Sequence, residues 1–467
     1  MATDILGLPS SDKFAAEGDR FYNHRREIMR YFPQGGASLT GLLSMIETEP
    51  VNDSIYIWYE DRYVSPTVTC RGTAALTSTA PSTGDADDGT TAGTGAKAIA
   101  TDFYLKVSST VDLKTGHLLR LESTGMTMRV IAVTRGVSDA TLLGYVKVNL
   151  QRAYTIASAT EYASGVLVRV VGTAMGEGAS ATGIGATSFK RPFPVQNTTQ
   201  IVYDKFEFPG SVLDMGLKYD KTGPYRKKSQ DTLIEHMTGI ERSLFWGKRA
   251  TTSRASFDTS QESLTTRTFS GILEFLELWD AGATGIAIDG ATYAPYSQHA
   301  AVTLDTDDNK RIITNSSGVM TKKLFDTYIE RCGRYHHNRT NEKLVICGSG
   351  ALMVANEMFQ RNSQFQVRYG EKAYGLSLMT YTSPFGDFHF VTHPLWNEDA
   401  TLRHWMMMLD IWSFRIRPLA NRDTRLLKNQ QPRGADFRRD AYRTELGLEC
   451  WQPEGNLLWK NIQTYSE

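Results

Sequence analysis

A cysteine and two histidines at the end of one predicted helix are residue types that bind zinc. Cys332 and His336 are four residues apart, so a helix would place both on one face, with His337 beside them. A structural zinc site needs four ligands, and the next cysteine, Cys347, falls in a segment that we predict to be a buried strand. Positive charge at a helix end also suits the helix dipole. We therefore expect histidines that end a helix, without a metal site or a cofactor.

The other motifs that could do chemistry are incomplete. The sequence CGSGAL (Cys347–Leu352) links a predicted strand to a helix, where phosphate can bind. It has no Gly-Lys-Ser/Thr, and Met353 stands where a Gly-x-Gly-x-x-Gly pattern needs glycine. Cys347 stands where a Gly-x-Ser-x-Gly elbow needs its first glycine. Three acidic residues lack the later glutamate of a calcium loop: Asp85, Asp87 and Asp88. We expect a plain connection and a solvated loop, and we predict no catalytic residue and no enzyme.

Positive charge gathers in two parts of a chain whose formal net charge is zero. One lies near the N-terminus, and the other is 411–443, which holds nine Lys or Arg and three Asp or Glu. The basic residues singled out are Arg20, Arg25, Arg26, Arg30, Arg433, Arg438, Arg439 and Arg443. Such a surface can face an anionic partner through phosphate contacts without base readout. Salt bridges between neighbouring subunits explain the pattern equally well, and both interpretations stay open.

Composition places the chain among ordinary globular proteins. It has 467 residues, enough for two or three domains, and is 41% hydrophobic and 22% charged. No run of about 18 apolar residues occurs, so no membrane-spanning helix is expected. The N-terminus has no basic region followed by an apolar core, so no secretory signal is expected. The cysteines are far apart and predicted to be free thiols in a reducing compartment: Cys70, Cys332, Cys347 and Cys450.

The longest predicted helix spans 226–250, near the middle of the chain. Its apolar residues step by four, three and four positions and form one stripe: Leu233, Met237, Ile240 and Leu244. A helix of about 24 residues is roughly 36 Å long, and one with a single apolar side must lie across another element. We expect that element to be a sheet, because the stripe is too short for a coiled coil.

Strand signals surround this helix. Residues 101–173 carry short strand patterns at about ten-residue spacing, which predicts a small β-barrel or sandwich. The preceding segment, 71–100, is rich in Gly, Ala, Ser and Thr and is predicted to be a flexible surface loop without a core. From about residue 265 helices and strands mix, and the C-terminal part is again β-rich, which predicts a discontinuous domain. In its last long strand two kinds of residue alternate: Leu446, Leu448 and Cys450 with Glu445 and Glu449.

In this order of parts the chain resembles the major capsid proteins of tailed bacteriophages, in the fold class typified by phage Hong Kong ninety-seven. SLTGLLSMIETEPVNDSIYIWYEDRYV resembles the segment after the N-terminal arm. NTTQIVYDKFEFPGS and DTLIEHMTGIERSLFWGKRA resemble the spine helix and its entry. TGMTMRVIAVTRG and VVGTAMGEGAS resemble the inserted β-region. RTFSGILEFL resembles the start of the axial domain, and RTELGLECWQPEGNLLWKNI the closing strand.

The resemblance implies an α+β, Hong Kong ninety-seven-like capsid fold with an inserted small β-domain. The expected parts are an N-terminal arm (1–36), an extended-loop region (37–100), an inserted β-domain (101–190), a peripheral domain (191–264) with the spine helix (226–250), an axial domain (265–403), and C-terminal strands of the peripheral domain (404–467). No residue of the chain maps onto the lysine and asparagine that cross-link subunits in the founding member of the fold.

The resemblance also implies a function, which is self-assembly into pentamers and hexamers of an icosahedral head shell around double-stranded DNA. The expected partners are copies in the same and neighbouring capsomers, a scaffolding, decoration or cement protein, and DNA held by non-specific contact, with no membrane. The expected locations are the host cytoplasm during assembly and then the virion. The basic residues would face the lumen. Three alternatives remain open: an encapsulin-like nanocompartment shell that packs cargo enzymes, an enzyme that uses the glycine turn and the 332–337 cluster, and a phage tail or decoration protein.

Overall fold

The computed structural model of the chain describes residues 46–60, 67–71, 75–80, 94–108, 110, 113–134, 144–174, 177, 193–214, 224–253, 265–281, 286–288, 291–293, 310–334, 342–361, 367–373 and 376–466. The chain divides into two compact units. The first is formed by Met1–Ile57, Gln196–Ala281 and Asn309–Glu467, and the second by Trp58–Val195 and Gly282–Asp308. None of the helices that the structure describes is both long and apolar enough to cross a membrane.

The second unit contains a seven-stranded sheet in the order β3-β11-β7-β8-β9-β6-β4. Its strands are β3 (Thr67–Thr69), β4 (Leu76–Thr77), β6 (Asp102–Lys106), β7 (His117–Leu121), β8 (Thr127–Thr134), β9 (Tyr145–Leu150) and β11 (Leu167–Thr173). Alternate residues point to one face of a strand, so Phe103, Leu105, Val146 and Val148 are all buried in one core. All five strand signals predicted between 101 and 173 therefore form strands of one sheet.

The prediction of a coreless loop over 71–100 is wrong at both of its ends. Ala75 and Leu76 are fully buried in the core of the β-domain, and Leu76 pairs with Leu105 of β6. At the other end β5 (Gly95–Lys97) pairs with β10 (Tyr154–Ile156). The β-sheet thus begins before the expected boundary at 101, and the acidic residues 85, 87 and 88 lie outside the described residues.

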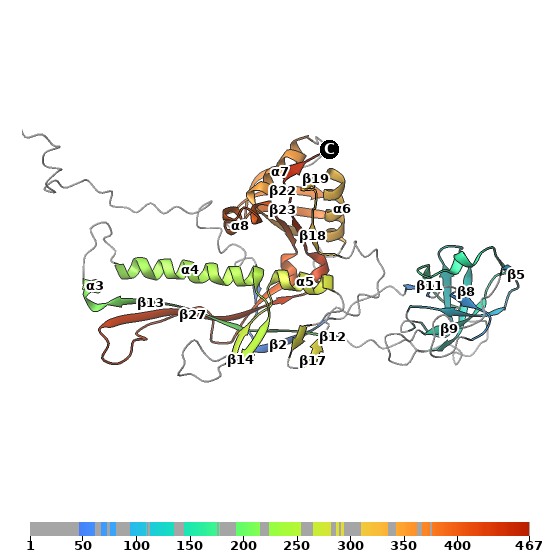
Figure 1. The fold of residues 1–467 in the computed structure, drawn as a ribbon, viewed down its shortest axis with the longest axis horizontal. Helices are drawn as coiled ribbons and strands as arrows, with labels where there is room; N and C mark the ends of the chain where they lie inside the picture. Colours follow the sequence, from blue (N-terminus) through green and yellow to red (C-terminus); the bar gives the residue numbers. More distant parts are fainter. Residues whose placement is uncertain are drawn as a thin grey trace, which may run out of the picture. The chain divides into compact units, whose positions relative to one another are not determined.

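The first unit contains a sheet that we call the platform sheet, in the order β1-β25-β27-β13, with β26 also paired to β27. Its strands are β1 (Glu47–Thr48), β13 (Gln200–Pro209), β25 (Phe414–Pro418), β26 (Arg425–Leu427) and β27 (Phe437–Cys450). β13 and β27 are antiparallel over ten residue pairs, from Gln200↔Leu446 to Pro209↔Phe437. Figure 1 shows the long helix α4 (Pro224–Trp246) lying along these two strands. The predicted helix on a sheet is confirmed, and so is the return of the C-terminal strands to it.

The second sheet of this unit, which we call the α/β sheet, has the order β18-β28-β24-β20-β23-β22-β21. Its strands are β18 (Ile312–Thr314), β20 (Glu342–Cys347), β21 (Val367–Ala373), β22 (Leu376–Ser383), β23 (Gly386–Thr392), β24 (Met406–Leu409) and β28 (Leu457–Lys460). The helices α6 (Lys322–Gly333) and α7 (Ser349–Arg361) pack on it, with Phe325 and Met358 in the shared core. The expected assignment of 404–467 to strands of the peripheral domain alone is corrected here. This segment supplies strands to both sheets, because β24 and β28 belong to the α/β sheet.

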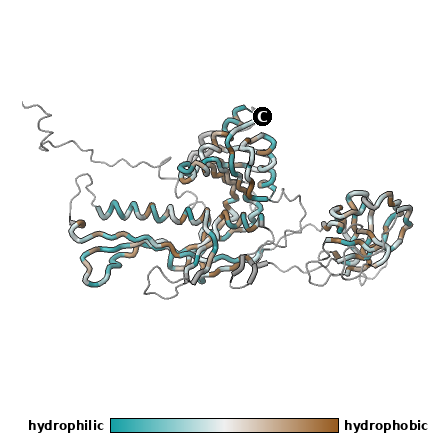
Figure 2. The backbone as a smooth tube through the Cα atoms, in the orientation of Figure 1, coloured by the Kyte–Doolittle hydropathy of each residue, from teal (hydrophilic) through white to brown (hydrophobic). Residues whose placement is uncertain are grey.

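The remaining described elements of the two units are shorter. They are α3 (Gly210–Asp214), α5 (Ile272–Ala281), α8 (Pro394–Glu398), the pairs β2 (Ile55–Glu60) with β12 (Phe193–Thr198), β14 (Ala250–Ser253) with β15 (Thr265–Thr268), β16 (Ile286–Ile288) with β17 (Ala291–Tyr293), and β19 (Val319–Met320) with β29 (Thr464–Tyr465), and the 3-10 turns η2 (Ala159–Tyr162), η5 (Leu402–His404), η6 (Ile411–Ser413) and η7 (Pro453–Gly455). Figure 2 shows that α4 is mainly hydrophilic along its length, in contrast to the central strands of the α/β sheet. Polar contacts therefore take a large part in holding this helix.

Candidate functional site

The residues proposed for metal or phosphate chemistry are placed in the core of the α/β sheet. Cys332 and Cys347 are fully buried, and burial raises the pKa of Cys332 to about 11 and that of Cys347 to about 12. His336 and His337 lie outside the described residues. Within the described part of the chain, no group of three or more His, Cys, Asp or Glu is placed to hold a metal ion.

The glycine turn before α7 is filled by the chain itself. A Cβ at Gly348 would lie 2.3 Å from the backbone of Arg403, and one at Gly350 would lie 2.9 Å from the His404 ring. The first amide of α7, Ser349 N, already donates to Asn397 Oδ1 at 2.7 Å. The glycines are needed for close packing, and the turn is a plain connection.

The buried face of α4 differs from the predicted stripe in its N-terminal half. Ile240 and Leu244 are buried, whereas Leu233 and Met237 are only half-buried. The buried residues of the helix are Thr232, His236, Ile240, Glu241, Leu244 and Phe245. The stripe is wrong here because polar residues are buried when they have partners, and β13 and β27 supply partners that a single sequence does not reveal.

A row of polar contacts joins the first half of α4 to the platform sheet. Asp440, Tyr442 and Thr444 alternate along β27 and so share the face toward the helix. The Tyr225 hydroxyl donates to the Asp440 carboxylate, and Ser229 Oγ lies 2.9 Å from the Tyr442 hydroxyl. Burial, followed by the contact with Asp440, raises the pKa of Tyr225 to about 12.

His236 contributes the most buried contact of this row. Its Nδ1 lies 2.6 Å from Asp204 Oδ2 on β13, and its Nε2 lies 2.8 Å from Thr444 Oγ1 on β27. The side chain of His236 is fully buried, whereas that of Asp204 is 39% exposed. One imidazole thus bridges β13 and β27, and both of its nitrogens are engaged.

The second half of α4 is joined to the loop between β23 and α8 by a buried acid and a buried base. Glu241 Oε1 lies 3.0 Å from His393 Nε2, with side-chain exposures of 0% and 6%. Phe245 packs edge-on to the His393 ring at 5.3 Å, and Trp396 lies 5.7 Å from Phe245. Burial raises the pKa of Glu241, and the hydrogen bond to His393 opposes that rise. This pair links the helix to the α/β part of the unit.

Two glycines approach each other closely at the C-terminal end of α4. Gly271 N donates to Gly247 O at 2.8 Å. A Cβ at Gly271 would lie 2.7 Å from the carbonyl oxygen of Leu244 and 2.8 Å from the carbonyl oxygen of Ser243. The segment that begins α5 can therefore approach the last turn of α4 only without a side chain at this position.

β27 is buried on both faces at its C-terminal end, so the alternation of leucine and glutamate expected there does not separate a buried face from an exposed one. Glu445 and Glu449 are as buried as the leucines beside them. The Arg417 guanidinium and the Trp451 indole donate to Glu449. Arg422 Nε lies 2.7 Å from Glu445. Arginines from the segment before β27 compensate these carboxylates, and spacing along β27 alone does not predict such partners.

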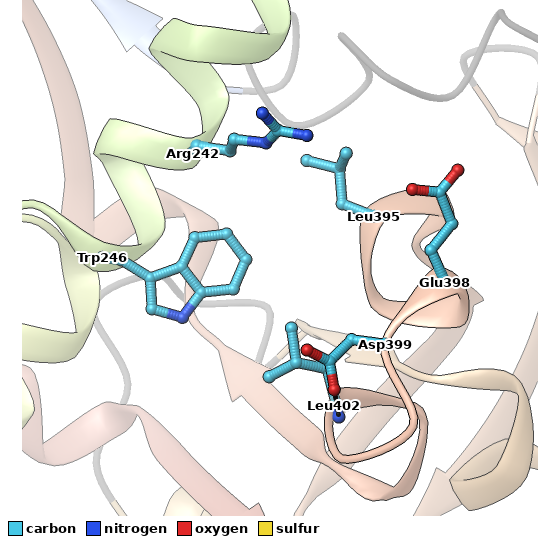
Figure 3. Close-up of a pocket in the computed structure, with 6 residues that line it drawn as sticks. All are labelled: Arg242, Trp246, Leu395, Glu398, Asp399 and Leu402. Atoms are coloured by element: carbon cyan, nitrogen blue, oxygen red, sulfur yellow. Dashed lines mark hydrogen bonds between the residues drawn. The ribbon is translucent and has the colours of Figure 1, made fainter.

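A small open groove of about 290 Å³ lies between α4 and the α8 region. Figure 3 shows Arg242 and Trp246 on one side and Glu398 on the other. Leu395, Asp399 and Leu402 complete the lining. Backbone hydrogen bonds from Thr401 and Leu402 lower the pKa of Asp399. The six lining residues include no serine, cysteine or histidine.

The basic residues singled out in the sequence are placed in several ways. Arg438 lies 3.0 Å from Asp440 and 4.3 Å from the centre of the Tyr225 ring, and Arg439 Nε donates to Glu207 at 2.7 Å. These two therefore pair within the chain. Arg433 is exposed and Arg443 is half-buried. The N-terminal residues Arg20, Arg25, Arg26 and Arg30 lie outside the described residues.

In the structural subunit described above, polar pairs join one long helix to the platform sheet and to the loop that follows β23. The chain belongs to the SU10 major capsid protein family, because the family model described as SU10 major capsid protein matches residues 23–463. It is therefore a major capsid protein of a phage head shell and a component of the virion. No curated protein matches the sequence.

Solved structures with a similar arrangement share little sequence with the chain. Mycobacterium phage Bobi is 8% identical over 98% of this chain and 99% of that chain, with a TM-score of 0.38. Mycobacterium phage Adephagia is 9% identical over 99% of each chain, with a TM-score of 0.37. The holo-SrpI encapsulin complex from Synechococcus elongatus PCC 7942 is 9% identical over 60% of this chain and 79% of that chain, with a TM-score of 0.36.

Proposed function

We propose that the protein assembles in the host cytoplasm into pentamers and hexamers, which close an icosahedral shell around double-stranded DNA without a catalytic step. The family match supports a shell subunit. The observation that carries the proposal is the bracing of α4 by polar pairs near both ends, to Asp440 at one end and to His393 at the other. A subunit that repeats many times in a closed shell needs such fixed geometry, because small errors in angle accumulate.

Each part of the chain has a proposed role in the shell. The platform sheet with α4 is the peripheral domain, and the α/β sheet is the axial domain, which gathers around the symmetry axes. The residues up to 36 are the N-terminal arm, and the β-domain extends the loop region that overlaps a neighbour. Many modest interfaces of this kind add up in a closed shell through multivalency.

The β-domain offers surface for a neighbouring copy, or for a scaffolding or cement protein. Three large apolar side chains on its strands are exposed to solvent: Ile131 at 40%, Leu167 at 42% and Val171 at 62%. Val171 and Ile131 both stand at register shifts, in β11 and β8. Bulges recur at sheet edges and interfaces, where they re-aim a side chain outward.

Negative-stain microscopy of the protein expressed alone, and with the scaffolding protein of its phage, tests assembly. Closed particles or rings of five and six subunits are expected. Dispersed monomers under both conditions would contradict the proposal. Nuclease-protected DNA in particles from infected cells is the expected content, whereas a packed cargo protein without DNA would favour an encapsulin-like shell.

A further inference from the structure

The face of the platform sheet that points away from α4 carries two arginines and a tyrosine in one row. Arg425 of β26 is the register partner of Arg443 of β27, and Arg443 is the register partner of Tyr203 of β13. Directly opposite residues in antiparallel strands point to the same face. Because Asp204 and Tyr442, the next residues along, contact α4, the row lies on the opposite face.

Among the residues that the structure describes, neither arginine of this row has a compensating acid. No residue that the structure describes forms an ion pair with Arg425 or Arg443, and Arg443 Nε is buried without a hydrogen-bond acceptor. Other arginines of the same unit are compensated, as in the pairs Arg439–Glu207 and Arg422–Glu445. Like charges directly opposite one another destabilise a sheet. The row therefore costs stability in the isolated chain, and an anion bound between the guanidinium groups would remove that cost.

The row is open to a ligand and chemically suited to phosphate. Tyr203 is 46% exposed, Lys205 beside it is 58% exposed in its side chain, and Arg425 is exposed. Neighbouring strands lie about 4.8 Å apart, so both guanidinium forks can reach one phosphate group or two adjacent ones. Arginine binds phosphate oxygens through two parallel hydrogen bonds, and a tyrosine hydroxyl can add a third donor.

We propose that Arg425, Arg443 and Tyr203 form a phosphate-binding row that contacts the backbone of packaged double-stranded DNA. This inference rests on the proposed enclosure of DNA and names the surface that performs it. It replaces the expectation from sequence that Arg438 and Arg439 face the genome, because the charges of those two residues are compensated within the chain.

Titration of a fluorescein-labelled DNA duplex with the full-length protein, followed by anisotropy at several salt concentrations, tests the row. The variant R425Q/R443Q removes two phosphate contacts. The negative slope of log K against log salt is therefore expected to become less steep by about 1.8. The same relation predicts about 60-fold weaker binding at about 0.1 M salt. The matched control R226Q/K228Q removes two exposed charges from α4, in the layer on the other side of the sheet, and is expected to keep the wild-type slope. R425K/R443K keeps the charge and is expected to retain most of the slope.

Four results would overturn the proposal. An unchanged slope in R425Q/R443Q excludes the row as a DNA contact. Thermal stabilisation of the wild type by inorganic phosphate, with duplex binding unchanged in the variant, would indicate a site for free phosphate. Loss of particles in R425Q/R443Q with unchanged duplex binding would indicate a contact between copies. Because repulsion is removed, the melting temperature of R425Q/R443Q is expected not to fall; a fall that R425K/R443K does not reverse would indicate a structural role. Failure of the wild type to form particles would refute shell assembly and would leave the duplex measurement valid.

Discussion

The buried pair Glu241–His393 predicts a loss of stability whose size depends on pH. The substitution H393F keeps the aromatic volume beside Phe245 and Trp396 but leaves the Glu241 carboxylate buried without its partner. Leaving a buried ionised carboxylate without its partner costs about 3–5 kcal/mol. A protonated carboxyl without its hydrogen bond costs only about 1–3 kcal/mol. The cost of H393F is therefore expected to be larger when Glu241 is ionised.

The sign of the pH dependence follows from the pKa of Glu241. Burial raises this pKa above the ordinary value of 4.5, and His393 opposes the rise, so H393F raises it further. A group whose pKa is higher in the folded state contributes stability below its unfolded pKa and loses it as pH rises through the folded pKa. H393F is therefore expected to lose about 3–5 kcal/mol at about pH 8 and only about 1–3 kcal/mol at about pH 5.

Urea denaturation followed by tryptophan fluorescence measures this difference, because Trp396 lies in the same cluster. The control E241Q/H393F carries no buried charge and is expected to lose about 1–3 kcal/mol at both pH values. An equal loss for H393F at both pH values, or a loss below about 1 kcal/mol at about pH 8, would refute the reasoning.

Three further predictions concern the packing of the same unit. H236A removes two hydrogen bonds between α4 and the platform sheet and is expected to cost about 2 kcal/mol, seen as a lower urea midpoint; a change within error would mean that the imidazole contributes nothing to the joint. G271A places a methyl group against backbone oxygens that cannot move aside and is expected to cost about 1–3 kcal/mol, whereas G434A, where space is open but φ is 84°, tests strain alone in the same urea assay. The buried thiols are expected not to react with Ellman's reagent at about pH 8 until denaturant is added, since burial raises the pKa of Cys70 to about 12 as it does for Cys332 and Cys347; rapid reaction of the native protein would contradict this.

The sequence alone predicts those elements whose patterns are local. The long helix is expected at 226–250 and is found at Pro224–Trp246, and the buried strand expected at Cys347 is found at Glu342–Cys347. Each of these signals depends on periodicity or turn residues within a short window, which tertiary packing does not override here.

The polar contacts that hold the helix could not be predicted, because their partners are distant in sequence. Thr444 is 208 residues from His236, and His393 is 152 residues from Glu241. A histidine and a glutamate on a helix ordinarily indicate a solvated face, so spacing alone favours the apolar stripe as the buried face of α4. The glutamates of β27 are a similar case. Their spacing does not reveal that arginines distant in sequence cover the two carboxylates.

The mixed chemistry of the surface under α4 has a mechanical consequence. If leucines alone made this contact, α4 could shift by one turn along the platform sheet at little cost, because one methyl group would take the place of another. Tyr225, Ser229 and His236 each meet a different acceptor or donor, so a displacement by one turn would strand several of them away from water. The contact between α4 and the platform sheet therefore resists a gradual shift, because several of its hydrogen bonds would be lost together. This property suits a shell whose subunits must keep one curvature.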